Sequence, residues 1–244
     1  MMSKSERLVQ LKRQGYLIPE FIVIRNVDEL RIKSELLCTN KFYAVRSSAN
    51  IEDGNEYSFA GIFNSYLNVK VENLKEKIEE CIRMDNCDNL HAYLRYFHMR
   101  GKKIRMEVIV QEMINCQISG VAFCMNTNNV INEIIIEAVR GVGIELISDK
   151  ITPDQIIIND SKVLKYKVGF QDKMLVCKDS GGIEEKSVRC IDQSKKKLDE
   201  HKIQKVIKLI EALNRNYKDS FEIEWGFLKG KLFLFQMRPI TYNK

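Results

Sequence analysis

The predicted final strand pair of the chain carries polar side chains at alternating positions. These side chains are Glu222, Glu224, Gln236 and Arg238. Alternation along a β-strand places the two carboxylates on one face, and the amide and guanidinium on one face of the partner strand. Carboxylate oxygens suit Mg²⁺, and the planar fork of an arginine suits phosphate. A polar sheet face stabilised by cross-strand ion pairs explains the same spacing, so the pattern alone leaves both interpretations open.

A second candidate group is Arg46, which follows the predicted strand 42–45 together with two serines. Ligand groups in open sheets are often presented where strands end, and an arginine there can hold a phosphate. A surface arginine in a turn is the alternative interpretation. Taken by itself, this signal does not decide between them.

Composition limits the classes of protein that fit the sequence. The chain has 244 residues, of which 45% are hydrophobic and 30% are charged, as in ordinary globular proteins. Its net charge is +6, from 39 basic against 33 acidic residues. The densest basic stretch, 195–197, is followed by Asp199 and Glu200, which is typical of a solvated helix face. We therefore expect no nucleic-acid partner.

The cysteines and the N-terminus indicate where the protein works. Seven cysteines are scattered without a CxxC pair, which favours reduced thiols in a cytoplasmic protein. Cys116 and Cys124 flank a predicted turn, but no histidine lies near them, so we expect buried free thiols. Residues 1–10 lack an apolar signal core, and no window reaches the length of a membrane span. We expect no membrane association.

The order of predicted elements indicates an α+β fold with much antiparallel strand. Helices are predicted over 5–14, 26–37, 74–84, 88–100 and 203–217. Strands are predicted over 21–24, 42–45, 59–69, 106–113, 120–124, 133–139, 156–158, 164–168, 221–225 and 231–236. The strands do not alternate regularly with helices, which argues against a βαβ series.

Several of these segments together resemble one family. The stretch 44–69 reads AVRSSANIEDGNEYSFAGIFNSYLNV, and 110–114 reads VQEMI. Residues 137–154 read EAVRGVGIELISDKITPD, and the C-terminal segment contains IEWGFLKGKLFLFQMRPIT. These motifs resemble, in the same order, the nucleotide-binding domain of phosphoenolpyruvate synthases, pyruvate phosphate dikinases and rifampicin phosphotransferases. Agreement of several motifs is far more specific than a single glycine loop.

The resemblance implies an ATP-grasp fold in which two subdomains, 1–105 and 106–244, enclose a cleft that binds Mg-ATP. It places Glu224 and Gln236 at the magnesium and triphosphate, with Glu222 in support. It places Arg46 and Arg238 at the β- and γ-phosphates, and Lys4 at the position of the family's phosphate-binding lysine. Strand 108–113 would contact the adenine, chiefly through Glu112 and Met113 with Gln111 beside them.

The sequence also departs from the family pattern. Both glycines that normally flank the lysine are absent around Lys4, and Ile144 stands where the family usually has glutamate. We find no counterpart of the swivelling phosphohistidine domain, and His91, His98 and His201 lack its sequence context. We therefore expect an ATP-dependent phosphotransferase module that passes a phosphate to a histidine on a separate carrier protein or to a small molecule. The alternative is a regulatory or degenerate protein that binds ATP without turnover.

Overall fold

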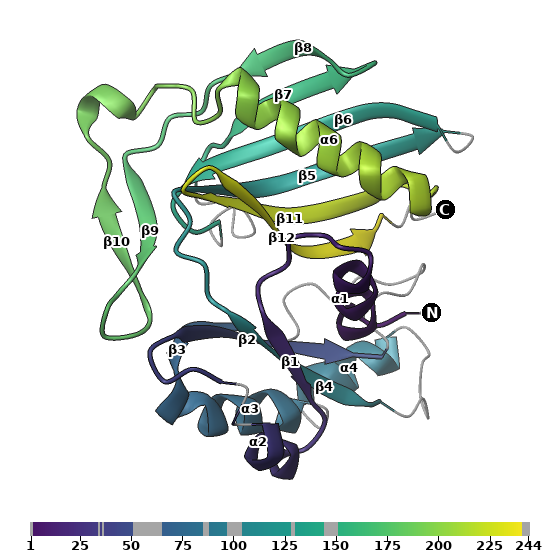
Figure 1. Cartoon of the computed structure of the whole chain (residues 1–244), viewed down its shortest axis with the longest axis vertical. Helices are drawn as coiled ribbons and strands as arrows, with labels where there is room; N and C mark the ends of the chain where they lie inside the picture. Colours follow the sequence, from purple (N-terminus) through teal and green to yellow (C-terminus); the bar gives the residue numbers. More distant parts are fainter. Residues whose placement is uncertain are drawn as a thin grey trace.

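Two antiparallel sheets lie one above the other, with a two-stranded hairpin at one side (Figure 1). This computed structural model describes residues 2–33, 35, 37–50, 65–84, 88–96, 104–127, 130–143 and 151–240. The lower sheet has the order β1 (Phe21–Ile24), β4 (Met106–Glu112), β2 (Phe42–Ala49), β3 (Ser65–Lys70). The upper sheet has the order β12 (Lys231–Pro239), β11 (Phe221–Leu228), β5 (Ile118–Thr127), β6 (Val130–Arg140), β7 (Asp154–Asn159), β8 (Lys162–Lys167). The hairpin consists of β9 (Lys173–Cys177) and β10 (Ile183–Ser187).

The described helices pack on the sheets, most of them on the outer faces and the N-terminal one between the two sheets (Figure 1). They are α1 (Lys4–Arg13), α2 (Val27–Lys33), α3 (Leu74–Arg83), α4 (Asp88–Tyr96) and α6 (Glu200–Asn216), with short 3₁₀ turns at η2 (Val71–Asn73) and η4 (Cys190–Asp192). Helix α6 lies across the upper sheet (Figure 1) and begins at Asp199, whose carboxylate accepts the Lys202 N–H at 2.8 Å. Its apolar stripe, spaced three and four residues apart, is buried.

Helices α2 and α3 pack against one face of the lower sheet, and the other face of that sheet looks toward the upper sheet. Tyr43 and Val45 on β2 belong to the core under these helices, together with Val108 and Val110 on β4. The alternate residues of β2, including Arg46, point the opposite way because side chains alternate along a strand. The sheet therefore directs Arg46 toward the space between the two sheets.

Helix α1 joins the two halves of the molecule. Its N-cap Ser3 forms a capping box with Glu6, and Gly15 ends the helical segment at a positive φ of 86°. Leu8 and Leu11 are buried in the core of the upper sheet, although they lie at the start of the chain. The N-terminal helix is thus packed with the C-terminal half.

Most predicted elements are confirmed, with some differences in length. Strand β2 continues to Ala49, so Arg46 lies within the strand rather than at its end. The hairpin β9–β10 was not predicted, because its strands are short and partly exposed and lack a clear apolar alternation. The predicted strand from residue 59 is observed from Ser65, and residues 51–64 lie outside the described part of the chain.

The pairing of β4 differs from what the predicted subdomain limits, 1–105 and 106–244, would suggest. β4 pairs with β1 and β2 in the lower sheet, whereas a division between residues 105 and 106 assigns it to the second half. An apolar run such as 106–113 carries no local signal of which sheet it will join. The chain passes from the lower to the upper sheet through residues 113–117, between β4 and β5.

The structure bears on the expectations about membrane spans and about the cysteine thiols. Among the described residues, no helix is long and apolar enough to cross a membrane. Cys116 and Cys124 are buried free thiols, as predicted. Burial raises the pKa of both thiols to about 12.

Candidate nucleotide-binding site

The C-terminal hairpin places its four polar side chains on the face that looks toward the lower sheet. Glu222 lies opposite Arg238, and Glu224 lies opposite Gln236, in the antiparallel register of β11 and β12. The residues between them, Ile223 and Met237, are buried in the core beneath α6. The two polar faces therefore coincide, and the Arg238 guanidinium lies 3.9 Å from the Glu222 carboxylate.

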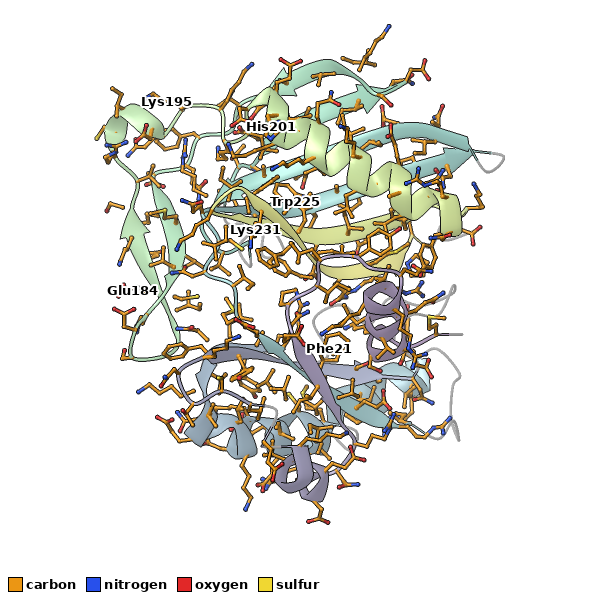
Figure 2. The ribbon with its side chains drawn as sticks, in the orientation of Figure 1. Phe21, Glu184, Lys195, His201, Trp225 and Lys231 are labelled. Carbon is orange, nitrogen blue, oxygen red and sulfur yellow. The ribbon has the colours of Figure 1, made fainter. Side chains whose placement is uncertain are left out.

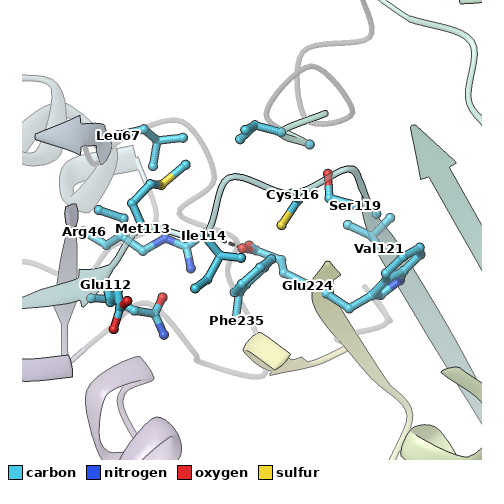
Figure 3. Close-up of a pocket in the computed structure, with 16 residues that line it drawn as sticks. Arg46, Leu67, Glu112, Met113, Ile114, Cys116, Ser119, Val121, Glu224 and Phe235 are labelled. Carbon is cyan, nitrogen blue, oxygen red and sulfur yellow. Dashed lines mark hydrogen bonds and ion pairs between the residues drawn. The ribbon is translucent and has the colours of Figure 1, made fainter. Parts of the chain in front are cut away.

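Arg46 reaches this face from the other sheet. Its guanidinium donates a hydrogen bond to Oε2 of Glu224, so that the ion pair connects β2 with β11. Only 18% and 19% of the two side chains are exposed, so the pair is poorly screened by solvent. Figure 3 shows the contact at the centre of a pocket between the sheets.

The positive charge around Glu224 stabilises its ionised form. Burial by itself raises the pKa of this carboxyl, because it disfavours the charged state. The charges of Arg46, Arg238 and Lys4, with the hydrogen bond from Arg46, oppose that effect, and the net pKa lies below its ordinary value. Glu224 is therefore an anion surrounded by cations, an arrangement that also suits a bound polyphosphate and its metal.

Lys4 is brought to the site by the start of α1. The N–H of Ser5 donates to Oγ of Ser48 at 3.2 Å, and Ser48 lies on the same face of β2 as Arg46. This contact fixes the first turn of α1 beside the strand that carries the arginine. Lys4 is near enough to Glu224 to contribute to the lowered pKa of that carboxyl.

The predicted adenine-contacting segment lines the other end of the pocket. Gln111, Glu112 and Met113 all belong to the pocket wall. The backbone N–H groups of Glu112 and Met113 already donate to carbonyl oxygens of Glu20 at 2.7 Å and Phe42 at 2.8 Å. The Glu112 carboxylate is bound by Lys41 at 2.7 Å, so this side chain has its own structural role.

The walls of the pocket are largely apolar, and no spacing in the sequence predicts which apolar residues form them. They are formed by Leu67, Ile114, Cys116, Val121, Val142, Trp225 and Phe235. Trp225 is fully buried behind Gly120, where an added Cβ would lie 2.0 Å from the carbonyl oxygen of Glu137 and 2.6 Å from the indole ring. This close approach explains the glycine in the Ser119-Gly120-Val121 motif. Apolar walls with a few polar groups are typical of sites that bind small molecules.

Several buried polar atoms around the cleft have no hydrogen-bond partner in the described part of the chain. They are Nε2 of Gln111, Nε2 of Gln236, Nε1 of Trp225 and Nε of Arg238. Gln111 and Gln236 are each only 3% exposed. Buried donors are normally satisfied, so orphaned donors in one region indicate a place for a ligand with acceptor atoms.

The geometry agrees with a family that matches nearly the whole chain. Residues 22–244 match the family described as "Pyruvate phosphate dikinase, AMP/ATP-binding domain". The chain belongs to this family of nucleotide-binding domains. It is 32% identical over 207 residues to a probable phosphoenolpyruvate synthase of Methanocaldococcus jannaschii, covering 82% of this chain and 17% of that protein. It is 26% identical to the rifampicin phosphotransferase of Bacillus subtilis, covering 82% of this chain and 23% of that protein.

Solved structures show the fold. An ADP complex of N5-carboxyaminoimidazole ribonucleotide synthetase superimposes with a TM-score of 0.50 and 7% identity, over 99% of this chain and 45% of the other. An L-amino acid ligase from Bacillus licheniformis gives a TM-score of 0.50 at 10% identity, over 98% and 42% of the two chains. The fold is ATP-grasp, as predicted.

Of the three histidines, only His201 has a side chain in the described part of the structure. His201 is exposed at the start of α6 (Figure 2), on the helix that covers the upper sheet. His91 lies on α4, and His98 lies outside the described residues. The chain spans 17% and 27% of the length of its first two curated relatives. Membership of the family therefore does not assign to this chain the phosphate acceptors of those whole proteins.

Proposed function

We propose that this chain binds Mg-ATP in the cleft and serves as a phosphotransferase module. The observation that carries the proposal is the Arg46–Glu224 ion pair, which joins the two sheets inside a pocket lined by residues 111–113. Family membership supports a nucleotide as the ligand. The phosphate acceptor would be a histidine on a separate carrier protein or a small molecule.

Each group in the cleft has a distinct part in this proposal. Gln111, whose Nε2 has no partner in the described part of the chain, and the backbone carbonyls of 112–113 would contact the adenine between apolar walls. Arg46, Arg238 and Lys4 would bind the β- and γ-phosphates and balance the charge that grows during transfer. Binding would thus exchange the Arg46–Glu224 contact for a contact of Arg46 with phosphate and of Glu224 with the metal.

The residues present also fit Mg²⁺. Within the described chain, no three His, Cys, Asp or Glu side chains gather as a metal cluster. Mg²⁺ needs few protein ligands, because waters and phosphate oxygens complete its shell. Glu224 and the amide oxygen of Gln236 would hold the ion, with Glu222 in support, and the ion would neutralise phosphate charge. Nε2 of the Gln236 amide has no hydrogen-bond partner among the described residues, so it could donate to a phosphate oxygen while the amide oxygen faces the ion.

One observation favours the alternative of a protein that binds ATP without turnover. Where the family has glycines around its lysine, Ser3 caps α1 and accepts the Glu6 N–H at 3.3 Å. A backbone donor at this helix terminus is therefore used within the helix, which reduces the groups free to surround a phosphate.

The free cysteines among the described residues support a reducing compartment, and we place the protein in the cytoplasm.

Calorimetric titration with Mg-ATP tests the proposal. We expect saturable binding that weakens in Glu224→Ala, because the carboxylate that holds the metal is removed. Glu72→Ala is the matched control, since Glu72 is exposed on the 3₁₀ turn η2 outside the pocket. Absence of binding to the wild-type protein, or equal binding by Glu224→Ala, would contradict the assignment of the site.

A further inference from the structure

Strand β3 contains a bulge at the edge of the pocket. Val69 pairs with Tyr43 and Tyr66 pairs with Val45, so Leu67 and Asn68 together oppose Ala44 alone. Asn68 adopts a positive φ of 56°, a conformation that asparagine tolerates better than most residues. A bulge turns a side chain away from its regular direction. Here Leu67 lines the pocket together with Ala44 (Figure 3).

The Asn68 side chain at this bulge binds the tip of the β9–β10 hairpin. Its amide nitrogen donates to the carbonyl oxygens of Lys178 at 2.7 Å and Gly182 at 2.8 Å. The backbone carbonyl oxygen of Asn68 accepts the N–H of Gly182 at 2.9 Å. Asn68 is 2% exposed, so these hydrogen bonds are shielded from water. The hairpin tip is thus attached to the lower sheet through one residue by three hydrogen bonds.

Strand β9 of the same hairpin is attached to the rim of the pocket. Val142, which lines the pocket, donates its N–H to the carbonyl oxygen of Leu175 at 2.9 Å. The N–H of Cys177 donates to Oδ1 of Asn115, in the connection between the two sheets, at 3.3 Å. Figure 1 shows the hairpin running from the upper sheet down to the side of β3. It therefore spans the two subdomains on the side of the pocket opposite α1.

The pocket takes its walls from both sheets, so its width depends on the links that hold the sheets together. The Arg46–Glu224 pair is one such link, but in the proposed function both side chains turn to the nucleotide. The contact of Asn68 with the hairpin uses no group that the nucleotide needs. It remains available as a link while the ligand is bound.

We propose that Asn68 is a positioning residue for nucleotide retention. It holds Leu67 in the pocket wall through the bulge, and it fastens the hairpin so that the two subdomains stay closed on the bound nucleotide. This inference rests on the proposed function, because it concerns the lifetime of the nucleotide complex. The physical prediction is that loss of the Asn68 amide speeds dissociation of nucleotide more than it slows association.

Three substitutions separate the bulge from the hairpin contact. Asn68→Gly keeps a residue suited to positive φ but removes the amide, Asn68→Ala loses both, and Asn68→Asp keeps the shape but turns an acceptor toward two carbonyl oxygens. Asn73→Ala is the control, since Asn73 is exposed and its side chain makes no capping hydrogen bond. Stopped-flow displacement of a fluorescent N-methylanthraniloyl-ATP with Mg²⁺ gives the dissociation rate constant. Hydrogen exchange over residues 173–187 reports the hairpin.

We expect dissociation to become roughly tenfold faster in Asn68→Gly and Asn68→Asp, as for loss of two ordinary hydrogen bonds. Exchange in the hairpin should rise in parallel, while Asn73→Ala matches the wild type. A wild-type rate constant in Asn68→Gly, whether or not the hairpin exchanges faster, would overturn this inference and leave nucleotide binding intact. A wild-type protein that binds no analogue would overturn the proposed function and this inference together.

Discussion

Arg46 on β2 and Glu224 on β11 belong to different sheets and meet in an ion pair inside the pocket. The contact brings together two residues that are 178 positions apart in the chain. Arg238 and Lys4 are close enough to influence the same carboxyl, and in the proposed function these groups bind the phosphates and the metal.

Replacement of either Glu224 or Arg238, on the C-terminal strands β11 and β12, should abolish phosphate transfer without unfolding the domain. We expect Glu224→Ala and Arg238→Ala to reduce any ATPase or kinase rate by about 100-fold or more, because each removes charge stabilisation. Release of phosphate or formation of phosphorylated acceptor is the measurement, with circular dichroism as the check on folding. Arg83→Ala serves as a control, since Arg83 is 76% exposed on α3. Full activity in both Glu224→Ala and Arg238→Ala would refute the assignment of the site.

Lys4 should contribute to ATP affinity. Lys4→Ala should raise the dissociation constant by roughly 5- to 30-fold, which corresponds to loss of one charge-assisted contact. Titration with Mg-ATP measures the effect, and Lys12→Ala on the same helix provides the comparison, because Lys12 pairs with Glu20 on the surface. An unchanged dissociation constant in Lys4→Ala would remove this lysine from the phosphate site.

The Arg46–Glu224 pair should make stability depend on pH in the acid range. The folded-state pKa of Glu224 lies below its ordinary value of 4.5, so the ionised carboxylate stabilises the fold above that value. This contribution is lost as pH falls through the lower, folded-state pKa. The free energy of unfolding of the wild type should therefore fall more steeply below about pH 4.5 than that of Glu224→Gln. Urea titrations between pH 6 and 3 make the comparison, and parallel curves would contradict it.

A second buried ion pair should matter for stability and not for binding. Nζ of Lys197 lies 2.6 Å from Oδ1 of Asp154, and both side chains are fully buried. Lys197→Met leaves an unpaired buried carboxylate, which should cost about 3–5 kcal/mol in the free energy of unfolding. Urea unfolding measures this cost, with the exposed Lys195→Met as control. A loss below about 1 kcal/mol would show that the pair is not important for the fold.

The cysteines should differ sharply in reactivity. Cys38 and Cys190 are exposed, whereas Cys116 and Cys124 are buried with pKa values raised to about 12. Only the thiolate reacts, so iodoacetamide at pH 8 should label the exposed pair first and the buried pair only after unfolding. Mass spectrometry of peptides gives the order of labelling. Rapid modification of native Cys124 would contradict its buried position.

The sequence by itself determined the local features of this protein. The alternation at 221–225 and 235–239 specified which side chains share a face, because a strand has a period of two. The apolar face of α6 and the turn at Lys229-Gly230 could likewise be predicted, since each depends on neighbouring residues. The order of motifs identified the family.

Only the tertiary structure decided how these features meet. No local pattern indicated that Arg46 would pair with Glu224, or that α1 would pack on the last strands of the chain, because both contacts depend on how the two sheets are stacked. The same holds for Asn68, whose role depends on a bulge and on a hairpin that the sequence did not reveal. Side-chain chemistry and periodicity are local properties, whereas a cleft between two sheets is set by packing over long sequence separations.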